Sequence, residues 1–253
     1  MPTIAIISEY DGTDFVGYQI QDNGRSVQQT LNEAVSEVYK TKLNVTGCSR
    51  TDAGVHARGH VSSVEVPFYI PEERIPLALN CFLPDDCCVK KAIYVNDGFN
   101  ARFESLGKRY IYRLQTGSCR SPLLNRYAHY VKGEPDIMLM KEAASIMVGE
   151  HDFAAFCAAG GSQKTTVRKM FAVNVRKDSS LIEIEVQGEA FLYNMVRIMS
   201  GTILYAGMGK LSADDIRELF ANPDRKNAGK TLPPEGLTLE EGYYDWSKWR
   251  KAD

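Results

Sequence analysis

Hydrophobic and polar positions alternate along several short segments of the chain, and a period of two predicts β-strands. The clearest case is 181–187, where aliphatic side chains occupy every second position and glutamates two of the positions between them. A short polar stretch separates this segment from a similar one at 169–176, so the two are expected to form a hairpin. The same pattern predicts further strands at residues 3–10, 44–49, 59–66 and 108–115.

Other segments have the spacing of amphipathic helices. The first follows Ser26, which with Gln29 has the spacing of a capping box. The longest covers residues 190–207, and Gly207 and Gly209 suit its C-terminal end. The remaining predictions are a helix at 136–148, a short helix between Pro76 and Pro84, and an apolar stripe on the longest helix formed by Phe191, Met195, Ile198, Met199 and Thr202.

Strands and helices are mixed in both halves of the chain, and hairpins occur among the strands. This arrangement favours an α+β fold with antiparallel sheet over a doubly wound parallel sheet. The chain of 253 residues is long enough for one large domain or two small ones. We predict two α+β halves, residues 1–104 and 105–253.

Composition places the chain among ordinary globular proteins, with 44% hydrophobic and 25% charged residues. The N-terminus lacks the pattern of a signal peptide, and no apolar run approaches the ~18 residues of a membrane span, so we expect a cytoplasmic protein without membrane contact. The six cysteines form no CxxC pair, and none of the four histidines has metal-ligand spacing. Reduced thiols and no metal site are therefore expected.

Basic residues are concentrated locally although the net charge is only −2. The stretch from Lys164 to Lys177 contains five basic residues and no acidic one, and Lys108, Arg109 and Arg113 surround two tyrosines. A basic run is most often a solvated face. Tyrosines among basic residues favour nucleic acid, because bases stack on aromatic rings.

The segment 47–57 (GCSRTDAGVHA) is the strongest candidate for chemistry, since it places Arg50, Asp52 and His56 around a glycine-containing turn. A plain turn with Asp52 bonded to its own backbone is the simplest interpretation. A lone aspartate also serves as base, nucleophile or metal ligand, and the spacing does not choose among these roles. The sequence contains no phosphate-binding glycine loop and no nucleophile elbow.

Residues 50–57 (RTDAGVHA) resemble the signature of the tRNA pseudouridine synthase A family. Further motifs of that family follow in order from residue 10 to about 244, nearly the whole chain. They stand at 10–19 (YDGTDFVGYQ), 25–28 (RSVQ), Asn80 with 83–84 (LP), 99–103 (FNARF), 108–112 (KRYIY), 151–153 (HDF), 191–197 (FLYNMVR), 228–229 (AG) and 233–237 (PPEGL). The chain departs from the common family pattern at Tyr18, His60 and Asn100, where Trp, Gln and His are usual.

The resemblance implies an isomerase that converts uridine to pseudouridine in the anticodon stem-loop of tRNA, at tRNA positions 38–40, without cofactor or metal. It implies the pseudouridine synthase fold, in which two ferredoxin-like or RRM-like halves share an extended antiparallel sheet with a central active-site cleft. The partners expected on the same ground are tRNA and a second copy of the chain in a homodimer.

The resemblance also assigns roles to residues. It makes Asp52 the catalytic carboxylate, Tyr110 the residue that stacks on the target base, and Arg197 the partner of the aspartate. Arg50 corresponds to a residue implicated in extruding the base. The remaining expected RNA-contacting or pocket residues are His56, Arg25, Lys108, Arg168, Tyr18 and Met195.

Two other kinds of function are open alternatives on the sequence. One is an inactive RNA-binding module on the same fold, which would have no need of Asp52, Tyr110 and Arg197 together. The other is an unrelated hydrolase that uses Asp52 with His56, which would need a small-molecule pocket.

Overall fold

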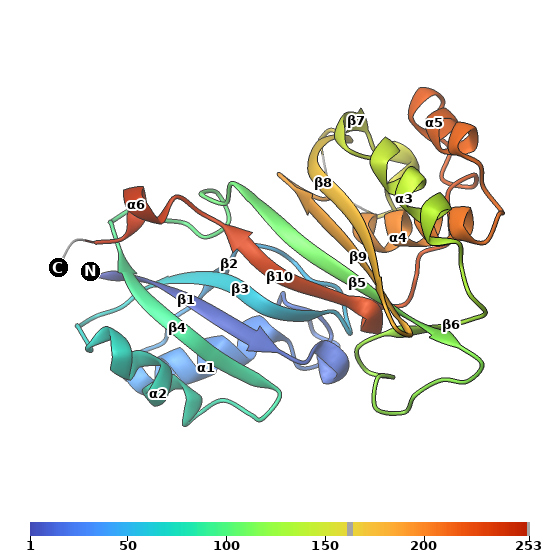
Figure 1. The fold of residues 1–253 in the computed structure, drawn as a ribbon. Helices are drawn as coiled ribbons and strands as arrows, with labels where there is room; N and C mark the ends of the chain where they lie inside the picture. The colour runs from blue at the N-terminus through green and yellow to red at the C-terminus, as the bar shows by residue number, and fades with distance from the viewer. Residues whose placement is uncertain (161–163, 252–253) are drawn as a thin grey trace. The chain divides into compact units, whose positions relative to one another are not determined.

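A computed structural model describes residues 1–160 and 164–251 of the chain (Figure 1). The predicted α+β class is confirmed, since helices and mostly antiparallel strands are mixed along the sequence. The chain divides into two compact units, Gly107–Thr238 and a unit that combines Met1–Leu106 with Leu239–Asp253. The final segment thus returns to the unit that begins the chain, whereas the sequence analysis grouped it with the second half.

The first unit is built on a sheet with strand order β4-β1-β3-β10, and the short β2 pairs with β3. Strand β1 runs antiparallel to both β3 and β4 and is buried on both faces, with Ile4, Ala5 and Ile6 fully buried. Figure 1 shows α1 and α2 together on one side of this sheet. The elements are β1 Thr3–Tyr10, α1 Val27–Tyr39, β2 Thr46–Gly47, β3 His56–Glu65, α2 Ile75–Asn80, β4 Cys87–Val95, β10 Leu237–Tyr243 and α6 Trp246–Trp249, with 3-10 turns at Gly12–Asp14 and Glu72–Arg74.

The second unit has strand order β5-β9-β8-β7, with β6 parallel to β5 at its far end. The predicted hairpin is confirmed as β8 and β9, and Ile182, Ile184 and Val186 of β9 are fully buried, as their alternation predicts. The elements are β5 Gly107–Gly117, β6 His129–Lys132, α3 Ile137–Ile146, β7 Gly149–Asp152, β8 Val167–Asp178, β9 Leu181–Gly188, α4 Met195–Gly207 and α5 Ala213–Ala221, with 3-10 turns at Ala154–Phe156 and Pro234–Gly236.

The strand predicted at 44–49 is reduced to the two residues of β2. At Val45, near the start of the predicted strand, the backbone bonds to side chains of α1 instead of to a neighbouring strand. Asn32 accepts a hydrogen bond from the backbone N–H of Val45 (2.7 Å), and the Gln28 amide donates to the Val45 carbonyl (2.9 Å). Because these groups satisfy the backbone at residue 45, strand pairing begins only at Thr46.

Two helix starts differ from prediction. Ser26 caps α1 by accepting from the N–H of Gln29 (3.3 Å), but the Gln29 side chain bonds Glu33, so only half of the predicted capping box forms. The helix predicted from residue 190 begins at Met195. Asn194 has a left-handed backbone (φ 58°), which an α-helix cannot continue through. No helix within the described ranges is long and apolar enough to cross a membrane.

Candidate active site

Asp52 lies in the loop between β2 and β3, and this loop is braced by residues 15–18. The N–H of Tyr18 donates to the Thr51 carbonyl (3.0 Å), and the N–H of Gly54 donates to the Phe15 carbonyl (3.3 Å). Within the loop, the N–H of Val55 donates to the Asp52 carbonyl (3.2 Å). These backbone bonds fix the turn, so the half-buried carboxylate of Asp52 stands on a rigid support.

Two glycines allow residues 12–18 to approach the loop. A Cβ added at Gly12 would lie 2.1 Å from the Val55 carbonyl oxygen. Gly17 has φ +116°, and a Cβ there would lie 2.8 Å from the Thr51 carbonyl oxygen. The close contact between the two segments therefore depends on residues without side chains.

Gly12→Ala should destabilise the protein, because the new methyl group has to displace backbone at Val55. We expect a loss of about 2 kcal/mol in unfolding free energy, which corresponds to a fall of ~4–8 °C in the melting temperature. Gly98→Ala is the control without a steric contact: no atom lies within 4 Å of its added Cβ, and although Gly98, unlike Gly12, has a positive φ (+87°), we expect backbone strain alone to cost less than the displacement at Val55. Equal losses in the two variants, measured by thermal unfolding, would contradict the steric explanation.

His56 and Tyr18, both expected to contact RNA, lie in the interior and are each only 3% exposed. The Nδ1 atom of His56 accepts from the N–H of Gly12 (3.0 Å) and lies 3.2 Å from a carboxylate oxygen of Asp11. Tyr18 stacks on His60 (ring centroids 4.1 Å apart), its hydroxyl bonds Ser62 (2.9 Å), and burial raises its pKa. Both rings are therefore part of the interior of the first unit.

Arg50 and Arg25 differ in their surroundings. Arg50 is exposed beside Asp52, as a residue that reaches RNA must be. Arg25 forms a two-point ion pair with Asp86, in which Nη1 donates to Oδ1 at 3.1 Å, and its guanidinium lies 4.1 Å from the centre of the Phe15 ring. The hydrogen bond that Arg25 donates to Asp86 raises the pKa of Arg25. Arg25 thus braces its own unit, and Asp86 offsets its charge.

In the second unit, Tyr110 stands near the start of β5 and is 6% exposed. Its ring meets Phe191 edge to face, with centroids 5.1 Å apart and an interplanar angle of 78°. Phe191 was predicted on the stripe of the long helix, but it precedes the helix and contacts Tyr110 instead. Lys108, two residues before Tyr110, is also buried (9% exposed).

Arg197 is held in place at the first turn of α4. Its Nε donates to the Leu232 carbonyl (2.7 Å), and its Nη1 donates to the Asn194 side-chain oxygen (2.6 Å). Asn194 is a site residue that the sequence analysis missed, and its left-handed backbone is a conformation that Asn adopts more readily than most residues. Met195, expected to line a pocket, is 1% exposed and belongs to the core.

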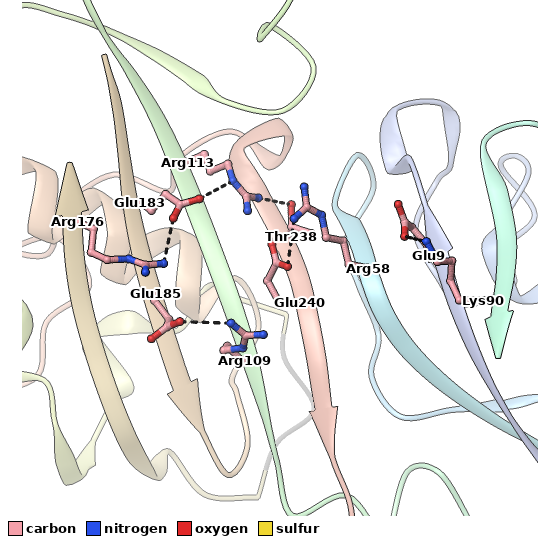
Figure 2. A network of polar contacts seen from close by, with 10 residues as sticks. All are labelled: Glu9, Arg58, Lys90, Arg109, Arg113, Arg176, Glu183, Glu185, Thr238 and Glu240. Atoms are coloured by element: carbon pink, nitrogen blue, oxygen red, sulfur yellow. Dashed lines mark hydrogen bonds and ion pairs between the residues drawn. The ribbon is translucent and has the colours of Figure 1, made fainter. Parts of the chain in front are cut away.

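Basic residues on β5 and β8 are neutralised by glutamates of β9 (Figure 2). Arg109 lies 3.5 Å from Glu185, while Arg113 and Arg176 both pair with Glu183 at 3.0 and 3.2 Å. Burial acts to raise the pKa of Glu185, but hydrogen bonds from Asn174, Gln187 and Arg109 outweigh it and lower the pKa. In the first unit, Figure 2 shows two further pairs, Glu9 with Lys90 and Arg58 with Glu240.

These pairs change the interpretation of the basic stretch at 164–177. Arg176 pairs with Glu183, and Lys177 pairs with Glu134. Arg168, on β8, is half-buried and donates from Nη1 to the Val167 carbonyl (2.6 Å). The local excess of positive charge is therefore smaller than the sequence indicates, and it falls on the first residues of the stretch.

The structure offers no metal centre within residues 1–160 and 164–251, where no group of three His, Cys, Asp or Glu side chains could hold an ion. No disulfide joins any of the six cysteines, all of which lie in the described part of the chain. The chemically capable groups are thus the half-buried Asp52 carboxylate in the first unit, and Tyr110 and the fixed Arg197 guanidinium in the second.

Comparison with known proteins identifies the family. The family model described as tRNA pseudouridine synthase matches residues 6–104 and 143–245. The chain belongs to the tRNA pseudouridine synthase family. Curated relatives named tRNA pseudouridine synthase A include that of Ruminiclostridium cellulolyticum, 42% identical over 96% of this chain and 100% of that protein, and that of Geobacter sp. (strain M21), 42% identical over 96% and 99%. The relative from Thermoanaerobacter sp. (strain X514) is 41% identical over 94% of this chain and 98% of that protein.

This tRNA pseudouridine synthase family is the one that the sequence motifs indicate, so the resemblance is confirmed at the level of the family. Both parts of the match include motif residues: the first contains the 50–57 segment, and the second contains Asn194 and Arg197. Members of the family are isomerases that act on uridine in tRNA.

Proposed function

We propose that this chain converts uridine to pseudouridine in the anticodon stem-loop of tRNA, with Asp52 as the catalytic carboxylate. The observation that carries the proposal is the placement of Asp52, half-buried on a turn whose backbone is fixed by residues 15–18, within the family motif. A rigid support suits catalysis, because a reacting group gains most when its position is fixed before the reaction.

The reaction is an isomerisation, so it needs no oxidant, reductant or co-substrate. The bond between C1′ of the ribose and N1 of uracil breaks, the base turns, and C1′ bonds to C5. The proton on C5 is lost and N1 gains one, which balances the atoms. Asp52 contributes either by attacking covalently or by removing a proton during cleavage of the glycosidic bond.

We assign supporting roles to three other residues. Tyr110, held edge to face by Phe191, is suited to stack on the target base. Arg197 supplies a fixed positive charge, and exposed Arg50 assists extrusion of the uridine. By the same family resemblance we propose that the protein acts as a homodimer in the cytoplasm.

The direct test is to incubate the purified protein with an unmodified tRNA transcript and to map pseudouridine along it. We expect pseudouridine in the 3′ side of the anticodon arm, formed without added metal or cofactor. Binding of the transcript with no pseudouridine at any position would favour the RNA-binding module instead. Pseudouridine outside the anticodon arm would contradict the assigned target but not the reaction.

Asn194→Gly should lower turnover on tRNA by about 10-fold, because Asn194 positions the Arg197 guanidinium. Glycine accepts the left-handed backbone of this residue, so the variant should melt close to the wild-type temperature. Asn194→Asp keeps the acceptor oxygen and should retain most of the activity. The measurement separates kcat from KM and records thermal unfolding alongside. A fall in melting temperature with unchanged kcat would mean that Asn194 is only structural.

A further inference from the structure

A pocket of about 240 Å³ lies between β6 and the C-terminal end of α4, entirely within the second unit. One wall is the short strand β6, and another is the last turn of α4, including Tyr205. Lys132, Lys210 and Lys230 reach it from three separate segments of the chain. The pocket therefore brings together side chains that are far apart in the sequence.

The three lysines are exposed, and none of them has a carboxylate within 4 Å among the described residues. The arginines of the neighbouring sheet, by contrast, are paired with glutamates. His129 also lines the pocket, and its Nδ1 lies 3.4 Å from a carboxylate oxygen of Glu235. The positive charge of the pocket thus comes from the lysines.

The lysines are not needed to cap α4. A helix C-terminus leaves four carbonyl groups without partners inside the helix, and lysines often serve them. Here the four carbonyls already accept backbone hydrogen bonds: Leu204 from Met208, Tyr205 from Lys210, Ala206 from Gly209 and Gly207 from Asp136, at 2.8–3.0 Å. Because backbone donors satisfy the helix end, the three ammonium groups are not engaged in capping it.

Lys230 is fixed by an unusually close backbone contact. A Cβ added at Gly201 would lie 2.0 Å from the Lys230 carbonyl oxygen, and one at Gly229 would lie 2.3 Å from the Gly201 carbonyl carbon. The N–H of Gly229 donates to the Thr202 hydroxyl (2.9 Å). Lys210 is oriented as well, with its ammonium 4.9 Å from the centre of the Tyr205 ring. The backbone of Lys230 and the side chain of Lys210 thus have defined positions beside the pocket.

The pocket is separate from the residues assigned to catalysis. Lys132 stands opposite Gly117 on β5, seven residues beyond Tyr110, which is about 23 Å along a strand. Tyr205 lies eight residues beyond Arg197 on α4, about 12 Å along the helix axis. A ligand in this pocket therefore cannot be the target uridine itself.

We propose that this pocket binds the phosphate backbone of the tRNA substrate at a second position, away from the modified nucleotide. Lysine ammonium groups are point charges that bind phosphate, and the rings of Tyr205 and Tyr130 at the same pocket suit an adjacent ribose or base. The identity of the anion as tRNA rests on the proposed function. The geometry of the pocket does not.

The test compares two triple variants that remove the same charge. The pocket variant carries Lys132→Gln, Lys210→Gln and Lys230→Gln, and the control carries Lys42→Gln, Lys141→Gln and Lys226→Gln, which are exposed lysines outside the pocket. Binding of an unmodified tRNA transcript is measured as a function of salt. We expect the pocket variant to bind about 10-fold more weakly near 100 mM salt, with a log–log salt slope smaller by ~0.7–0.9 for each lost contact. The control should remain close to wild type.

A second measurement does not depend on the variants. Bound tRNA should protect the three pocket lysines of the wild-type protein from acylation by an amine-reactive ester, and should leave Lys42, Lys141 and Lys226 reactive. Equal binding by the two triple variants, or pocket lysines that stay reactive under tRNA, would overturn the proposal. Protection by tRNA in a protein that forms no pseudouridine would refute the proposed function and retain the pocket.

Discussion

Asp52→Asn is expected to reduce pseudouridine formation on tRNA by at least ~10⁴-fold. Replacing a residue that takes part directly in the reaction typically lowers turnover by this much. The amide has almost the shape of the carboxylate but can neither attack C1′ nor accept a proton. The loop should keep its form, since the bonds that fix it join backbone groups, such as the N–H of Val55 to the Asp52 carbonyl. Binding of tRNA should persist, because affinity comes mostly from phosphate contacts.

The rate of pseudouridine formation, measured in single-turnover assays with enzyme in excess, decides this prediction. The matched control is Asp97→Asn, an exposed carboxylate in a turn of the same unit, which should react at the wild-type rate. Retention of a tenth or more of the wild-type rate in Asp52→Asn would exclude Asp52 as the catalytic carboxylate. Loss of tRNA binding together with turnover would indicate a structural role instead.

The sequence predicts the regular elements well where one local pattern decides them. Ile182, Ile184 and Val186 alternate with polar residues, and a strand with one buried face is the structure that this pattern allows. The hairpin of β8 and β9 follows from it. The helix after Ser26 is equally well determined, because a cap and an apolar face agree.

The local pattern fails where contacts distant in sequence decide the outcome. Side chains of Gln28 and Asn32 take the backbone bonds of Val45, and this shortens the predicted strand. The segment Leu239–Asp253 joins the first unit through β10, which lies beside β3. No periodicity within 44–49 or 237–243 encodes a partner on another element, so neither result is visible in the sequence alone.

In the candidate site, too, some features follow from the sequence and others depend on contacts between distant residues. Asp52, Tyr110 and Arg197 come from family motifs, since the spacing of residues did not choose a role for Asp52. Pairing of Arg109 and Arg113 with glutamates depends on strand register, so the sequence analysis counted these arginines as available charge. The grouping of the pocket lysines could not be predicted from the sequence, because three separate segments of the chain supply them.

Arg197→Ala should lower turnover by ~10²–10³-fold, the range expected when a preorganised charged donor is removed from a reacting centre. Arg197→Lys should restore little of the activity. The guanidinium donates at the same time to the Leu232 carbonyl and to Asn194, and a single ammonium cannot reproduce this planar two-point geometry. Rates are measured at saturating tRNA so that weaker binding does not enter the comparison.

Arg225→Ala separates a catalytic role of Arg197 from a structural one. Arg225 braces the same segment of the second unit, donating to the Gly229 carbonyl (2.9 Å) and to the Thr231 hydroxyl (3.0 Å). Both alanine variants leave acceptors without their donors, so both should lose about 1–3 kcal/mol of stability. Only Arg197→Ala should also lose turnover in the folded protein. Similar rate losses in the two variants would assign Arg197 to the support of this segment alone.

The family resemblance further predicts that Arg197 acts by pairing with Asp52, and a double-mutant cycle on turnover tests this. Because Asp52→Asn leaves too little activity to compare, the cycle uses Asp52→Glu, which keeps the carboxylate and moves it by one methylene group. If the two residues pair, the cost of Asp52→Glu should be about 10-fold smaller in the Arg197→Ala background than in the wild type, since the interaction it disturbs is already absent. Additive effects would mean that the arginine and the aspartate contribute to the reaction independently.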